Sequence, residues 1–168
     1  MRKRENVGIL ERMIKMTRRE KAGALFVEGY NCAQAVAIAF EDLHGVDRET
    51  IAKLSSSFGG GMGRLREVCG SVTGMFMVAG LLYGYDDPKA KTEKTDHYTR
   101  IQKLAADFQQ ENGSIVCREL LGLTEKKQEP TPEARTAEYY KKRPCKELVG
   151  IATEIMDNYI RNEEFLNR

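Results

Sequence analysis

The stretch VCGSVTGMFMVAGLLYGY, residues 68–85, contains no charged side chain over 18 residues and decides how the remaining segments can fold. Its length reaches the lower limit for a membrane-spanning helix. Four glycines, one serine and one threonine lower its hydrophobicity, however, and no basic cluster adjoins it as an orienting signal. We therefore predict a helix buried at the centre of the protein, without membrane insertion. Gly70 and Gly74 leave a small-residue notch on it, where another helix can approach closely.

The segments around this stretch repeat apolar residues at intervals of three and four, which is the spacing of one helical face. Cap signals bound several of them: Asn31 and Asp47 begin helices, and Gly45 and Gly113 follow helix ends. No segment shows sustained strand-like alternation, and no internal repeat is present. The sequence predicts an all-α bundle of about six to eight helices around the central glycine-rich helix. Helices are expected over residues 1–28, 31–44, 47–58, 69–85, 87–112, 114–122 and 144–166.

The whole chain, residues 1–168, has the length of one domain with its own hydrophobic core. Within it we distinguish an N-terminal amphipathic helix (1–28), a module with the four cysteines (29–150) and a C-terminal helix (144–166). Residues 124–136 carry many charges and two prolines, so they are predicted to form a mobile connection.

The net charge limits the kinds of binding partner, and the N-terminal sequence indicates the cellular compartment. The chain has 27 basic and 25 acidic side chains, a formal net charge of +2, which indicates neither nucleic-acid nor membrane-surface binding. The opening MRKRENVGILERMIKMTRREK lacks the apolar stretch of a secretory signal, so we expect a cytoplasmic protein. In a reducing compartment, cysteines are more often thiols, thiolates or metal ligands than structural disulfides.

Four cysteines are the most informative feature: Cys32, Cys69, Cys117 and Cys145. No two form a C-x-x-C pair, which excludes zinc-finger, thioredoxin-like and haem-attachment patterns. Each falls within about the first turn of an expected helix, where free backbone N–H groups lower a thiol's pKa and favour the thiolate. If the four helix starts converge, they form a thiolate cage suited to an iron–sulfur cluster. The alternative for any single cysteine is a small buried core residue.

The segments GYNCAQAV (29–36) and FGGGMGRLREVCGSVTG (58–74), followed by lone cysteines at 117 and 145, resemble the C-GCAxxG-C-C family of redox-active proteins. The resemblance runs from about Leu25 to Val149 and implies four functional cysteines with redox chemistry. One departure is Ser71, where the family motif has alanine; its hydroxyl adds a hydrogen-bonding group beside Cys69. The family is also similar to part of the split-Soret cytochromes, but no C-x-x-C-H occurs here, so no haem is predicted.

The glycine-rich loop lacks a P-loop string and follows no strand, so a phosphate cradle is a weak interpretation. We expect its glycines instead to let the backbone approach the cysteines, with N–H groups donating to sulfur. Arg64 and Arg66 beside it either hold an anion or raise the thiolate character of Cys69, although solvated surface arginines are commoner. The candidate cofactor-contacting residues are Gly59, Gly60, Gly61, Gly63, Gly70 and Ser71.

These observations favour a small redox protein that binds an iron–sulfur cluster, most simply [2Fe–2S], and passes electrons to a partner protein. The ligands would be Cys32, Cys69, Cys117 and Cys145. One alternative is thiol–disulfide exchange by the same cysteines without metal, in an enzyme or a sensor. Another is a structural zinc site with four cysteine ligands. The small-residue notch also makes a homodimer a possible assembly.

Overall fold

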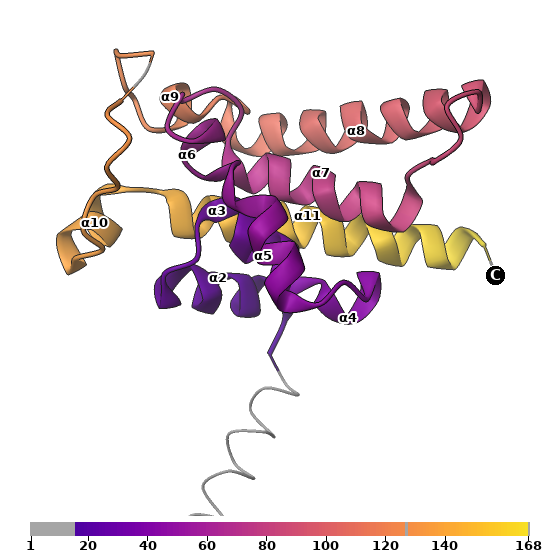
Figure 1. Ribbon diagram of the computed structural model, residues 1–168, viewed down its shortest axis with the longest axis horizontal. Coiled ribbons are helices and arrows are strands. Elements are labelled where there is room, and N and C mark those ends of the chain that lie inside the picture. The colour runs from indigo at the N-terminus through magenta and orange to yellow at the C-terminus, as the bar shows by residue number, and fades with distance from the viewer. Residues whose placement is uncertain (1–15, 127, 168) are drawn as a thin grey trace, which may run out of the picture.

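The computed structural model describes residues 16–126 and 128–167, and this part of the chain forms helices and no strand (Figure 1). The all-α prediction is confirmed. Six helices have eight or more residues: α2 (Arg18–Glu28), α3 (Cys32–Ala39), α5 (Arg48–Ser56), α7 (Gly70–Tyr83), α8 (Lys91–Asn112) and α11 (Cys145–Leu166). Shorter helices lie between them: α4 (Glu41–His44), α6 (Gly59–Met62), α9 (Cys117–Leu120) and α10 (Ala137–Lys142).

Side-chain caps set several helix starts. The Asn31 side chain accepts a hydrogen bond of 2.9 Å from the Gln34 N–H, and the Gln34 side chain accepts one of 2.9 Å from the Asn31 N–H. This capping box starts α3 as predicted. A second capping box at Thr17 starts α2 at Arg18, so the helix expected over 1–28 is interrupted there. Residues 1–15 of that expected helix lie outside the described part.

Two expected boundaries differ in the last third of the chain. Ser114 does not begin a helix; its hydroxyl accepts a hydrogen bond of 3.0 Å from the Val116 N–H, and α9 begins only at Cys117. The helix α10 was not predicted, because its few apolar residues give no helical stripe; it begins after Thr136, which caps the Tyr139 N–H. The last helix begins after Pro144 as expected.

The helix α3 forms the centre of the core together with α7. Its residues from Ala35 to Ala39 are fully buried, and α2, α5, α7 and α11 all contact it. Burial of α3 extends beyond the one apolar face that its spacing indicates, because its sequence CAQAVAIA has a single polar side chain and can be enclosed on nearly every side. Full burial of each Val or Ile stabilises the fold by about 1.5–3 kcal/mol.

The predicted notch on α7 receives α3. A Cβ atom added to Gly74 would lie 2.7 Å from the Ala33 carbonyl oxygen and 3.0 Å from the Ala33 Cα. A Cβ atom on Gly70 would lie 3.0 Å from the Cys32 Cβ. The two helices can therefore pack this closely only because glycines occupy both positions. Since α3 of the same chain fills the notch, the notch itself gives no reason to expect a homodimer.

The long helices α8 and α11 run beside α7 and contact it and each other (Figure 1). Leu104 and Phe108 of α8 are fully buried, as expected from the apolar stripe of that segment. Val149, Ala152 and Met156 of α11 are also fully buried. Among the described helices, none combines the length and the apolar composition that a membrane crossing requires.

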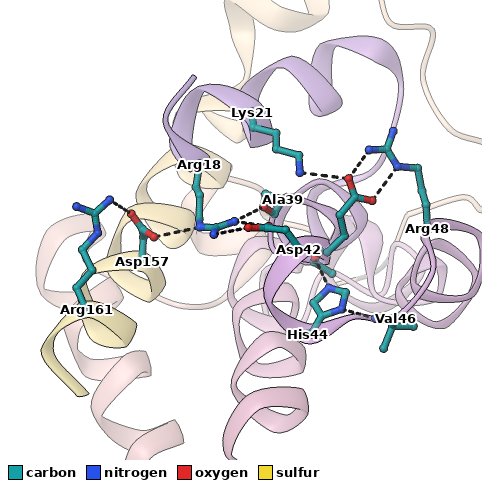
Figure 2. Close-up of polar contacts among 11 residues, drawn as sticks. Arg18, Lys21, Ala39, Asp42, His44, Val46, Arg48, Asp157 and Arg161 are labelled. Carbon is teal, nitrogen blue, oxygen red and sulfur yellow. Dashed lines mark hydrogen bonds and ion pairs between the residues drawn. The ribbon is translucent and has the colours of Figure 1, made fainter. Parts of the chain in front are cut away.

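A polar network fastens α2 at the end of α3 that lies away from Cys32. Figure 2 shows the Arg18 guanidinium donating to both Asp42 carboxylate oxygens, at 2.6 and 2.8 Å, and to Asp157 of α11 at 3.2 Å. The same guanidinium donates to the Ala39 carbonyl oxygen at 2.9 Å, which satisfies a group at the end of α3. Arg18 thus joins three parts of the bundle through one side chain.

The close packing of α3 on α7 predicts a contrast between two glycines of α7. Gly74→Ala should destabilise the fold by about 1–3 kcal/mol, because its Cβ would collide with the α3 backbone. Gly80→Ala is the matched control: nothing lies within 4 Å of its added Cβ, so it should stabilise the helix by about 0.5–1 kcal/mol. Urea unfolding of both variants measures the difference, and equal stabilities would contradict the packing described.

Candidate functional site

The four cysteines meet at one end of the bundle, where the first turns of α7, α9 and α11 lie close together (Figure 1). Cys69 is the residue before α7, and the other three are the first residues of α3, α9 and α11, so each lies at a helix start as predicted. All four line one small cavity of about 20 Å³. Cys69 and Cys117 are 5% and 6% exposed, whereas Cys32 and Cys145 are partly exposed. No disulfide joins any of the four.

An isolated antiparallel bridge between Val68 and Val116 aligns two of the cysteines. The Cys69 N–H donates to the Ile115 carbonyl oxygen at 2.8 Å, and the Cys117 N–H donates to the Glu67 carbonyl oxygen at 2.6 Å. The segments before α7 and α9 are therefore held side by side by their backbones. This pairing joins segments far apart in the sequence, and the sequence pattern contains no signal for it.

Glycine backbone forms part of the cavity wall. Gly60, Gly61 and Gly70 line the cavity, as expected for a loop that approaches the cysteines. Gly61 has a φ of +66°, and an added Cβ would lie 2.6 Å from the Cys117 Cβ. Only glycine combines this backbone conformation with this closeness.

The remaining predicted glycine and serine contacts lie outside the cavity wall. Gly59 packs against the cap of α3, since its added Cβ would lie 2.4 Å from the Asn31 Cγ. Gly63 ends α6 in a left-handed conformation, and its N–H donates to the Gly59 carbonyl oxygen at 2.8 Å. The Ser71 hydroxyl is fully buried and has no hydrogen-bond partner in the described part of the protein. The N–H and the hydroxyl of Ser71 lower the pKa of Cys69, against the larger effect of burial.

The loop after Gly61 directs one arginine inward. Met62, Arg64 and Arg66 all have left-handed backbone conformations, with φ between +60° and +67°. Such conformations are costly for residues with a side chain and concentrate at functional sites. Arg66 is 3% exposed and lines the cavity. The interpretation of Arg66 as a solvated surface arginine is therefore wrong, because the loop turns it toward the cysteines.

The Arg66 guanidinium contacts Cys117 and not Cys69. Its Nη1 donates to the Cys117 Sγ at 3.5 Å, while Nε and Nη2 donate to the Gln128 Oε1 at 3.0 and 2.6 Å. Among the described residues, no carboxylate forms an ion pair with it. A buried cation without a carboxylate needs negative charge from another source, and the neighbouring sulfur is the nearest candidate.

The irregular segment 124–136 is tied to this corner of the site. The Gln128 N–H donates to the Arg64 carbonyl oxygen at 3.2 Å, and the Arg64 Nε donates to the Glu129 carbonyl oxygen at 2.5 Å. Glu133 pairs with Arg143, which lies two residues before Cys145. The prediction of a mobile connection did not anticipate the contacts with Arg64 and Arg66, because they join residues more than 60 positions apart.

The pKa values of Cys32 and Cys145 shift in opposite directions. Hydrogen bonding from the Cys32 thiol lowers the pKa of Cys145 to about 7, and the charge of Arg143 lowers it further. The same interaction raises the pKa of Cys32 well above its ordinary value, and so does the removal of its sulfur from water, although the residue as a whole is partly exposed. Cys145 is therefore the thiol of this pair that ionises first.

The other two cysteines ionise less readily. Burial raises the pKa of Cys69 to about 11, although the N–H of Ser71 acts in the opposite direction. Burial also raises the pKa of Cys117, against the hydrogen bond and charge of Arg66. Helix starts thus do not by themselves make these two thiols acidic, since removal from water outweighs the helix dipole.

The four cysteines line one cavity without forming a site for a single metal ion. Cys32 and Cys145 influence each other's pKa, while Cys69 and Cys117 adjoin the backbone bridge. Within residues 16–126 and 128–167, no group of three or more cysteine, histidine, aspartate or glutamate side chains is placed to hold a metal ion. The metal-ligand role of the four cysteines therefore stays a prediction.

A comparison with known protein families gives a match over the segment that contains the four cysteines. The sequence profile described as "Putative redox-active protein (C_GCAxxG_C_C)" matches residues 30–159. The chain belongs to this family. The matched range contains all four cysteines, the glycine-rich loop and Arg66, so the C_GCAxxG_C_C assignment covers every residue that lines the cavity. No curated protein and no solved structure matches the chain.

The pKa of Cys145 gives a test in metal-free, reduced protein. The thiolate is the nucleophile, so alkylation of Cys145 by iodoacetamide should accelerate with a midpoint at about pH 7, compared with about 8.5 for an ordinary cysteine. Cys32→Ala removes the hydrogen bond and should move the midpoint upward. Mass spectrometry of the modified peptide follows the rate. A midpoint at or above pH 8.5 in the unaltered protein would contradict the described pair.

Proposed function

We propose that the protein is a small electron-transfer protein that holds an iron–sulfur cluster, in its simplest form [2Fe–2S], through its four cysteines. The observation that carries this proposal is the convergence of four thiols, from four separate helix starts, on one cavity. Four cysteine thiolates are the usual donor set of such clusters. The family supports redox chemistry of the chain, and the cluster is our more specific proposal.

The charges around the cavity suit an anionic group. Arg66 brings a buried positive charge against the Cys117 sulfur. The charges of Arg143, Arg66 and Arg135 lower the pKa of Cys145. The first turns of α7 and α11 also direct free backbone N–H groups toward the same region. Several thiolates can be tolerated together only where positive charge of this kind compensates them.

Glycine backbone leaves free space between the cysteines. The cavity of about 20 Å³ has room for one water molecule, and metal–thiolate bonds of about 2.3 Å are shorter than water contacts, so bonded atoms need less free space. The glycine at 61 keeps this space open, because a Cβ there would reach Cys117.

Held by Cys32, Cys69, Cys117 and Cys145, such a cluster would supply one-electron transfer. The chain's own residues then determine how a redox partner reaches the site. Cys69 and Cys117 are buried, so the electron path to the surface is shortest on the side of Cys32 and Cys145. We therefore expect the partner protein to dock beside the first turns of α3 and α11.

Removal of one ligand tests the proposal. Cys69→Ser protein, reconstituted with iron and sulfide without oxygen, should bind the cluster at least about tenfold more weakly and lose most visible absorbance. The matched control is Ser55→Ala, because Ser55 is also fully buried but donates only within its own helix, to the Ile51 carbonyl oxygen at 2.6 Å. Unchanged absorbance in Cys69→Ser, at wild-type stability, would contradict the proposal.

Cys32 and Cys145 line the same cavity and shift each other's pKa in opposite directions, which favours a second candidate function, thiol–disulfide exchange without metal. The Cys145 thiolate would attack one sulfur of a partner's disulfide, and the other partner sulfur would leave as a thiolate and take up a proton. Cys32 would then lose its proton and attack Cys145 in the mixed disulfide, which releases the second partner thiol. The chain gains a Cys32–Cys145 disulfide, and two electrons pass to the partner's disulfide.

Thiol counting tests this second function. Metal-free protein equilibrated with glutathione disulfide should lose two of its four free thiols, and reductant should restore both. Cys117→Ser, which lies outside the reacting pair, should lose two of three thiols in the same way. Retention of all four thiols in the unaltered protein under oxidising conditions would exclude a Cys32–Cys145 exchange reaction.

A further inference from the structure

Among the residues that the structure describes, no carboxylate forms an ion pair with the buried guanidinium of Arg66. It is 3% exposed, and its hydrogen bonds go to a neutral amide oxygen and a sulfur. By contrast, Arg118, next to Cys117 in the sequence, pairs with the exposed Glu67 at 2.9 Å. Burial of an unpaired charge is strongly unfavourable, so the position of Arg66 needs an explanation beyond stability.

The Gln128 side chain fixes the direction of the guanidinium. Its Oε1 accepts from Nε and Nη2 at 3.0 and 2.6 Å, which leaves Nη1 directed at the Cys117 sulfur at 3.5 Å. The backbone at Arg66 is held separately, because its carbonyl oxygen accepts from the Arg118 N–H at 3.2 Å. A long, flexible side chain is thereby restricted to one orientation, which points into the cavity.

The position of this charge relates directly to electron transfer. Reduction of a sulfur-bound centre adds one negative charge in the cavity, and a positive charge a few ångströms away stabilises that addition. Water screens the interaction little, because the guanidinium and the Cys117 sulfur are both buried. Hydrogen bonds to cysteine sulfur and nearby charge are among the factors that set the potential of iron–sulfur clusters.

We infer that Arg66, held by Gln128, is a positioning residue that raises the reduction potential of the four-cysteine centre through the Cys117 sulfur. This inference rests on the proposed iron–sulfur function and adds to it the residue that sets the potential. It also gives the irregular segment 124–136 a function, since the side chain that fixes Arg66 belongs to that segment. Changes in the segment would then reach the centre through one amide oxygen.

A purely structural interpretation is that Arg66 only ties segment 124–136 to the loop. The variants Gln128→Glu and Arg66→Met together separate the two interpretations. Glutamate keeps the shape and the acceptor of glutamine, so the fold should be retained, but its added negative charge lowers the potential in either interpretation. Arg66→Met removes the guanidinium charge and adds no charge near the centre, so the inference predicts a lower potential in this variant as well, whereas a structural tie predicts no change in it.

The experiment is a potentiometric titration of the visible spectrum in cluster-loaded, full-length protein. Gln128→Glu and Arg66→Met should each lower the potential by an amount equal to at least a tenfold change in the ratio of reduced to oxidised centre, about 59 mV for one electron. Gln102→Glu is the matched control, since the same change on the exposed face of α8 should shift this ratio less than threefold.

The outcomes are distinct. A lower potential in both Gln128→Glu and Arg66→Met, with an unchanged Gln102→Glu, supports the inference. An unchanged potential in loaded Arg66→Met or in loaded Gln128→Glu overturns it. Where Arg66→Met does not bind the cluster, Arg66→Gln, which also lacks the charge, replaces it with the same two outcomes. Failure of the unaltered protein to bind any cluster overturns the proposed function and, because the inference rests on that function, the inference as well.

Discussion

The close contact between α3 and α7 is the constraint on which the site depends. Gly70 and Gly74 let the α3 backbone approach within a distance that any side chain would prevent. This approach brings the starts of both helices together, so Cys32 and Cys69 face the same cavity. The core and the site therefore depend on the same contact, because the residues that bury α3 also determine where two of the four sulfurs lie.

Burial of the cysteines disfavours their thiolate forms, and the surrounding residues offset this effect at one cysteine more than at the others. Removal from water raises the pKa of Cys69 and Cys117, while the hydrogen bond from Cys32 and nearby arginines lower that of Cys145. The metal-free site therefore favours one thiolate over four. Ionisation of all four requires strong compensation, which a bound cationic metal would supply and Arg66 would assist.

Local signals in the sequence were sufficient for much of the fold. Asn31 and Asp47 mark helix starts because their side chains bond to backbone only three residues away, and the uncharged stretch marks a buried helix because its composition alone requires burial. The inward position of Arg66 could not be predicted in this way. It depends on Gln128 and on the Val68–Val116 bridge, which are distant in sequence and leave no periodic pattern.

The most direct measurement of the central claim is iron, zinc and acid-labile sulfide analysis of protein purified without oxygen. If the four converging thiols hold a [2Fe–2S] cluster, the analysis should find iron and sulfide in equal amounts, about two of each per chain. Zinc alone would make the site structural. Absence of both metals, after anaerobic purification and attempted reconstitution, would contradict the cluster and leave the Cys32–Cys145 pair as the reactive part of the site.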